Sequence, residues 1–209
     1  VKGPFVADAA TALPFAPAAI YRNDEVTTSA ALSPYDVYYY NESARTVWIY
    51  NKRAAGRVTA VSPSASAPTS VTVAGVTYTI ASPSVAYQLS SLSGGGVGQV
   101  VTLLLGMNDA AVSVLTGDAA DAVFYGVVQS SSRTLVETNG AEVQQAVSVM
   151  CTDGTARTVN VDNKLNFPAG KLVEISVDGD GESVQSISPR STSGTVSADG
   201  TALGDTPFA

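Results

Sequence analysis

The sequence predicts an all-β protein made of two tandem, small β-barrel-like modules related by internal duplication. Thr, Ser, Val, Ala and Gly are abundant and charged residues make up only 14% of the chain, a composition rich in strand and turn formers. Short apolar runs alternate with turn residues, as they do in β-sandwiches and barrels. One motif also occurs more than once, and this repetition indicates several units of one kind.

The clearest repeat relates residues 98–115 to residues 170–187. Each segment has an apolar strand, a turn and a returning strand, which is the pattern of a β-hairpin. A looser copy lies at residues 47–63. We expect the two clear copies to have equivalent surroundings. Aligned without gaps, they match Gly98 with Gly170, Val101 with Val173, Leu103 with Ile175, Leu105 with Val177, Val112 with Val184, and Leu115 with Ile187.

The first module is expected to span residues 20–117. Residues 1–19 read as an extended lead-in, because their three prolines break both helices and strand ladders. A hairpin over 70–80 has Ala74 and Gly75 at its tip, where glycine supplies the positive φ that such turns need. A short helix is expected at 85–92, capped by Ser84. The remaining expected strands are 36–40, 45–50, 57–61 and the 98–115 hairpin.

The second module is expected to span residues 118–190 and to repeat that order. We match 121–125 to 36–40, 133–136 to 45–48, and 147–161 to the 70–80 hairpin. Closing each sheet into a small barrel would remove its exposed edges. The alternative is one larger β-sandwich that shares strands across the duplication. Residues 191–209 read as a linker or as the start of a further repeat.

Charge, hydropathy and cysteine content exclude several classes of function. The net charge is −7 and the basic residues are scattered, so we expect no nucleic-acid partner. No apolar run approaches the ~20 residues of a membrane span, so we expect no span in this chain. Cys151 is the one cysteine, which excludes an intrachain disulfide, and it reads as a small buried apolar side chain.

The sequence has no recognisable catalytic motif. It contains no histidine, and the patterns of serine hydrolases, phosphate-binding loops and dinucleotide sites are absent. Most carboxylates fall in expected turns, where solvent surrounds them. We therefore expect a non-enzyme without a cofactor. The same reasoning predicts no metal site, although Asp178, Asp180 and Glu182 resemble the start of a calcium loop and are its weak candidate ligands.

Aromatic side chains cluster on two expected neighbouring strands of the first module. Tyr38 and Tyr40 on one strand, with Trp48 and Tyr50 on the next, could form one aromatic face. Such a face could stack on sugar rings, because aromatic side chains offer an apolar surface with a polar tip. Ordinary cross-strand packing is the competing interpretation of the same residues.

Three runs carry a resemblance to a known family, namely YRNDEVTTSAALSPYDVYYYNESARTVWIY, SPSASAPTSVTVAGVTYTI and GQVVTLLLGMN. They resemble the repeated regions found beside S-layer homology domains in large cell-surface proteins of Gram-positive gut bacteria. The resemblance covers most of residues 20–190, and it carries no catalytic residues. The helical S-layer homology module itself is not in this chain. The resemblance implies an extracellular location, at the cell surface or in the cell wall.

Two functions follow as expectations. The first is a non-catalytic structural or spacer module whose partners are neighbouring modules of the same parent protein. The second is a carbohydrate or host-ligand binding module that uses the aromatic face of the first module on cell-wall or surface glycans. The solvent exposure of Trp48 and Tyr50 distinguishes the two.

Overall fold

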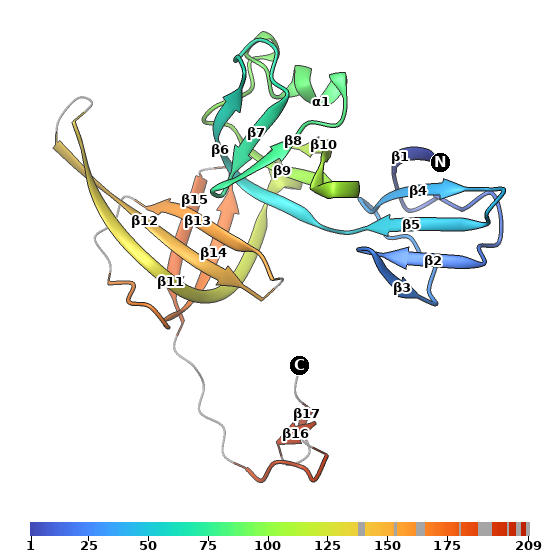
Figure 1. The fold of residues 1–209 in the computed structure, drawn as a ribbon. Helices are drawn as coiled ribbons and strands as arrows, with labels where there is room; N and C mark the ends of the chain where they lie inside the picture. The colour runs from blue at the N-terminus through green and yellow to red at the C-terminus, as the bar shows by residue number, and fades with distance from the viewer. Residues whose placement is uncertain are drawn as a thin grey trace.

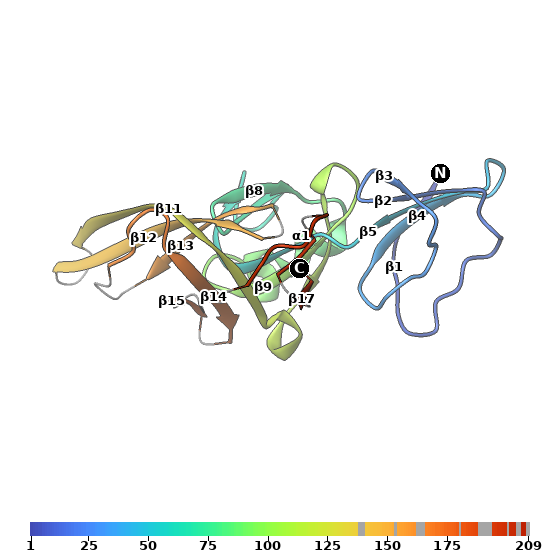
Figure 2. The ribbon, with the colours of Figure 1, turned by 90° about the horizontal axis from the view of Figure 1, so that it is seen from below.

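The chain folds into three five-stranded sheets that follow one another along the sequence. The computed structural model describes residues 1–137, 141–152, 154–161, 166–179, 181–187, 194–199, 201–203 and 206–207. Figures 1 and 2, seen from two directions, show the three sheets in a row, with the N-terminal sheet at one end and the most C-terminal of the three at the other. The all-β fold class is therefore confirmed. Each named strand belongs to one sheet, so the described residues do not form one larger sandwich with shared strands.

The N-terminal sheet contains residues 2–50 in the order β1-β4-β5-β2-β3. Strand β2 runs parallel to β5, and all other neighbouring strands of this sheet are antiparallel. The expected lead-in takes part in this sheet, because β1 pairs with β4 and the backbone N–H of Ala18 donates to the carbonyl of Arg45 at 2.7 Å. The strands are β1 (Lys2–Val6), β2 (Ala19–Arg22), β3 (Glu25–Thr27), β4 (Val37–Asn41) and β5 (Thr46–Tyr50).

The second sheet, which we call the first repeat, spans residues 53–115 in the order β10-β9-β6-β7-β8. A parallel bridge between Ile80 and Ala111 joins its two edges, so the sheet closes on itself. Helix α1 (Pro83–Gln88) covers one end, with the Ser82 hydroxyl accepting the Val85 N–H at 3.3 Å. The strands are β6 (Arg53–Ser62), β7 (Ser70–Val73), β8 (Val76–Thr79), β9 (Val100–Leu105) and β10 (Ala111–Leu115), with 3-10 turns at Ser91–Ser93, Met107–Asp109 and Gly117–Ala120.

The third sheet, the second repeat, spans residues 122–186 in the order β13-β12-β11-β14-β15. Its edge strands β13 and β15 contact each other, so this sheet also curls toward closure. Phe167 and Ile175 are among the side chains that fill its interior. The strands are β11 (Ala122–Glu137), β12 (Ala141–Cys151), β13 (Ala156–Val161), β14 (Leu172–Asp178) and β15 (Gly181–Ser186); beyond them β16 (Ala202–Leu203) pairs with β17 (Thr206–Pro207).

The two repeats share one topology, which confirms the internal duplication. Numbered from its own first strand, each repeat has the spatial order fifth, fourth, first, second, third. Leu103 and Ile175 are 0% and 1% exposed, and each lies on the fourth strand facing the first. A bulge follows Val58 in β6 and Val128 in β11. The hairpin alignment read from sequence therefore corresponds to equivalent places in space.

Each repeat has a glycine at the equivalent position of its first strand, with close neighbours that leave no room for a side chain. Gly56 pairs with Val101 in the first repeat, as Gly126 pairs with Val173 in the second. A Cβ on Gly126 would lie 2.6 Å from the Cγ1 atom of Val149 and would also meet the carbonyl oxygen of Met150. Any larger residue would force the first and second strands apart at this corner, which is where small barrels use glycine.

The structure does not support the sequence-based match of residues 121–125 to residues 36–40. Because β6 and β11 hold equivalent partners, the counterpart of residues 122–127 is 52–57, and residues 36–40 belong to a separate sheet. The expected module 20–117 therefore contributes to two sheets. The segments 36–40 and 121–125 share β-prone aromatic residues, and this local likeness says nothing about which distant strand each one pairs with.

Candidate functional site

The four aromatic side chains expected on one face lie on two faces. In the β4–β5 register, Trp48 is opposite Tyr39, and Tyr38 is opposite Ile49. Directly opposed residues in an antiparallel pair point to the same side, so Trp48 and Tyr50 share their face with Tyr39. Tyr38 and Tyr40 point to the other side, and the predicted shared face is wrong. A register shift of one residue exchanges the faces, and the sequence did not fix that register.

The face with Tyr39 and Tyr50 packs against the first repeat. These two residues are 8% and 3% exposed and form an apolar cluster with Leu104 of β9. Their rings meet edge to face at 5.9 Å, and burial raises the pKa of both hydroxyl groups. The Tyr39 hydroxyl accepts the Met107 N–H at 3.3 Å, while the Tyr50 hydroxyl donates to Asp24 at 2.6 Å. This face is an interface between sheets.

On the opposite face, Tyr38 and Tyr40 contact aromatic side chains of the N-terminal segment, where Phe5 of β1 is the direct cross-strand neighbour of Tyr38. The ring of Phe5 lies 5.4 Å from that of Tyr38 and 5.5 Å from that of Tyr40, and Phe15 meets Tyr40 edge-on at 5.7 Å. The ammonium group of Lys2 lies 5.6 Å from the centre of the Tyr40 ring. These two tyrosines are half-buried, and their rings lie against those of Phe5 and Phe15.

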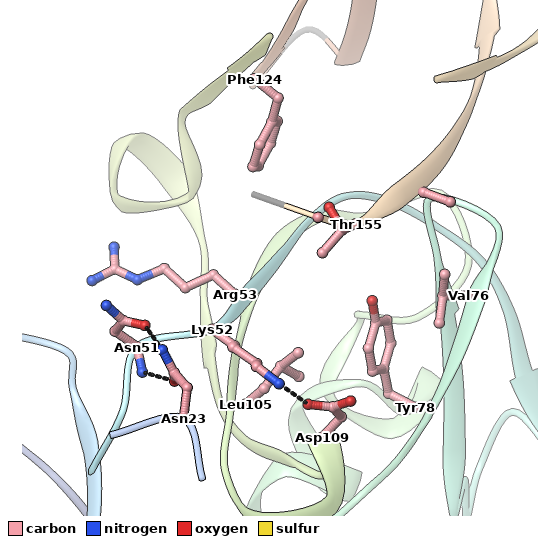
Figure 3. Close-up of a pocket in the computed structure, with 12 residues that line it drawn as sticks. Asn23, Asn51, Lys52, Arg53, Val76, Tyr78, Leu105, Asp109, Phe124 and Thr155 are labelled. Carbon is pink, nitrogen blue, oxygen red and sulfur yellow. Dashed lines mark hydrogen bonds and ion pairs between the residues drawn. The ribbon is translucent and has the colours of Figure 1, made fainter. Parts of the chain in front are cut away.

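A pocket of about 690 Å³ lies where the three sheets meet, as Figure 3 shows. Its floor includes the two residues that connect β5 to β6, Asn51 and Lys52. The ring of Phe124 comes from the second repeat and that of Tyr78 from the first. The lining is completed by Asn23, Arg53, Val76, Leu105, Asp109, Gly154, Thr155 and Ala156.

The polar groups of this pocket bind one another across the sheet boundaries. Asn23 and Asn51 exchange two hydrogen bonds, of 2.7 and 3.2 Å, between the N-terminal sheet and the connector. The ammonium group of Lys52 lies 3.5 Å from a carboxylate oxygen of Asp109 in the first repeat. Arg53 donates to the carbonyl of Pro34 at 3.4 Å. The pocket can admit a polar ligand, and these internal contacts also connect the N-terminal sheet to the first repeat.

The boundary between the two repeats is held by Arg157, which sequence reasoning missed. This residue of β13 is 4% exposed and donates to the carbonyls of Ala55 at 3.1 Å and Arg53 at 3.4 Å. Its guanidinium group lies 3.5 Å from the centre of the Phe124 ring. Arg157 falls in the same alternation as Val159 and Val161, so a charged residue in the buried phase of a strand was the available signal.

Glu182 approaches the first repeat from β15 at the same boundary. Its Oε1 atom accepts the backbone N–H of Arg57 at 2.6 Å. Burial raises the pKa of the Glu182 carboxyl, while this hydrogen bond and the positive charges of Arg57 and Arg157 act in the opposite direction. One of the three weak candidate metal ligands, Glu182, therefore already accepts a hydrogen bond from the backbone of the first repeat.

The other two candidate metal ligands are Asp178 and Asp180. Asp178 pairs with Gly181 in the β14–β15 ladder, and Asp180 lies outside the described residues. Within the described part of the chain, no group of three or more acidic, cysteine or histidine side chains is placed to hold a metal ion. Cys151 is 4% exposed and belongs to the interior of the second repeat.

The raised pKa of Glu182 predicts a pH-dependent effect of replacing it. The folded state favours the neutral carboxyl, so this residue's contribution to stability is full below its ordinary pKa and falls as the pH rises through the raised value. We expect Glu182→Gln, which keeps an acceptor for Arg57, to unfold at equal or higher urea concentration than the parent at pH 7. The difference should shrink on acidification.

The control for this prediction is Glu182→Leu. It removes the acceptor and should lower the urea midpoint at both pH values, because the Arg57 N–H loses that partner. A glutamine variant that is less stable than the parent at pH 7, with a gap that widens in acid, would contradict the prediction.

The comparisons with known proteins return no relative. No family model matches the chain, and neither a curated protein nor a solved structure matches it. In the part of the chain that the structure describes, no helix is both long and apolar enough to span a membrane.

Proposed function

We propose that this chain is a non-catalytic structural or spacer module of a bacterial cell-surface protein of the S-layer type. Its place would be extracellular, at the surface or in the cell wall, and its partners would be neighbouring modules of the same parent protein. The resemblance of residues 20–190 to regions beside S-layer homology domains and the low content of charged residues support this proposal.

One observation carries most of the argument: successive sheets share apolar clusters. Leu104 of the first repeat packs with Tyr39 and Tyr50 of the N-terminal sheet. Ala55 of the first repeat is 2% exposed and belongs to the apolar cluster of the second repeat. Independent binding domains on flexible linkers would not need such shared packing. Joined sheets in a row are suited to holding two ends of a protein at a fixed distance.

The alternative function has less support. A carbohydrate or host-ligand site that uses Tyr38, Tyr40, Trp48 and Tyr50 together requires one accessible aromatic face. The β4–β5 register divides these residues between two faces, and Tyr50 is buried. We therefore propose contacts with neighbouring modules, rather than with glycans, as the main interaction.

Small-angle X-ray scattering of the full chain tests the spacer role. We expect an elongated particle whose longest dimension stays constant as salt is raised, because the apolar clusters and the buried Arg157 and Glu182 contacts at the sheet boundaries are little affected by ionic screening. A pair-distance distribution typical of domains joined by flexible linkers would contradict the spacer role.

An antibody raised against the chain tests the proposed location. It should label intact cells of the source bacterium, and labelling only after lysis would contradict the surface location.

A further inference from the structure

The second repeat carries an exposed apolar face on its outer surface. The outward side chains of β11 include Val123 and Tyr125, which are 52% and 49% exposed. Met150 of β12 is 41% exposed and Leu172 of β14 is 38% exposed. These four residues and Val127 define what we call the β11 face. A pocket of about 390 Å³ lies within it. A continuous apolar patch of this kind indicates an interaction surface.

The duplication identifies the matching surface of the first repeat. Because Gly56 and Gly126 are equivalent, the outward residues Arg53, Ala55 and Arg57 of β6 correspond to Val123, Tyr125 and Val127 of β11. By the same register, Val100 of β9 corresponds to Leu172 of β14. The same part of each barrel can therefore be compared directly.

In the first repeat, this surface is covered by the second repeat. Ala55 and Val100 pack into the second repeat's apolar cluster. Two edge strands supply the covering contacts: Arg157 and Thr158 on β13, and Glu182 on β15. The Thr158 N–H donates to the carbonyl of Ala74 at 2.9 Å. The outward surface of β6, formed by Arg53, Ala55 and Arg57, is thus an interface between the two repeats. The β11 face is its uncovered equivalent.

We infer that the β11 face is the docking site for a further module of this same repeat type, placed on the second repeat as the second repeat is placed on the first. The inference rests on the proposed structural role and specifies one of its contacts. It also defines the chemistry of the occupant. Val123 and Val127 stand where the first repeat has arginines, so the docking module carries an uncharged residue at the position of Glu182.

A chain extended by one repeat tests this inference. A copy of residues 122–187 is inserted after Ile187 through the natural connector 116–121, and the copy carries Glu182→Gln. Leu172→Cys in the original second repeat reports on the β11 face, in a Cys151→Ala background. We expect its thiol modification to slow about tenfold relative to the unextended chain, because docking removes the site from solvent.

Two further proteins make the result decisive. Val26→Cys on the N-terminal sheet, 81% exposed, should react at the same rate with and without the extension. A grafted chain with Val123→Arg, Tyr125→Ala and Val127→Arg presents the outward set of β6 to an unaltered copy, and should also show protection. Protection in the grafted chain alone would overturn the assigned occupant, and protection in neither would overturn the equivalence of the two faces. Either failure, with the unextended chain still rigid in scattering, would leave the spacer role standing.

Discussion

Replacing Ala55 with aspartate is expected to destabilise the protein by about 3 kcal/mol or more, because it buries a carboxylate, on a larger side chain, in a packed apolar cluster. Ala55 is 2% exposed, and its side chain lies among the apolar residues of the second repeat although its backbone belongs to the first. Urea denaturation monitored by circular dichroism measures the loss. We also expect the second repeat to exchange its amide hydrogens faster, because it loses its cover.

The duplication provides the matched control for this substitution. Tyr125 is the equivalent residue of the second repeat and is 49% exposed. Tyr125→Asp should lower the free energy of unfolding by only about 1 kcal/mol, because its side chain is half exposed and the main loss is that of a good strand former. Equal losses for Ala55→Asp and Tyr125→Asp would show that the boundary between the repeats is not the packed interface described above.

The second large effect is expected for Arg157→Met. Methionine keeps an unbranched apolar chain but cannot donate to the carbonyls of Ala55 and Arg53, and it has no charge to lie over the Phe124 ring. Leaving buried carbonyls without these donors and losing the cation–π contact should cost about 2–4 kcal/mol. The urea midpoint of the full chain measures this loss.

An exposed arginine serves as the comparison for Arg157. Arg133 lies on the exposed part of β11, so Arg133→Met should leave the urea midpoint nearly unchanged. If Arg157→Met proved as harmless as Arg133→Met, then Arg157 would not hold the two repeats together, and their alignment would have to depend on apolar packing alone.

The repeated hairpins were predictable because their signal is local. In β14, Val173, Ile175 and Val177 alternate with more exposed residues, so the sequence itself shows which side faces the interior. In β9, by contrast, every residue from Val101 to Leu105 is buried, because Leu104 on the other side of the strand packs with Tyr39 and Tyr50 of the N-terminal sheet. The N-terminal sheet was harder to predict, because β1 is exposed throughout and finds its partner β4 about thirty residues away.

The candidate site depended on information that the sequence does not contain. The choice of face for Tyr38 and Trp48 depends on strand register, which the turn between β4 and β5 sets. Glu182 looked like a turn carboxylate because nothing in its neighbourhood points to Arg57, 125 positions earlier in the chain. Long-range pairs of this kind become visible only once both repeats are folded.

The position of Ala55 also limits how such a protein can be rearranged by recombination. A crossover in the connector 116–121 would separate the two repeats cleanly in the gene, yet the upstream product would expose Ala55 and Val100 to water. The downstream product would lose part of the lining of its interior. The first repeat also shares an apolar cluster with the N-terminal sheet through Leu104, so the smallest segment that could be transferred intact contains all three sheets.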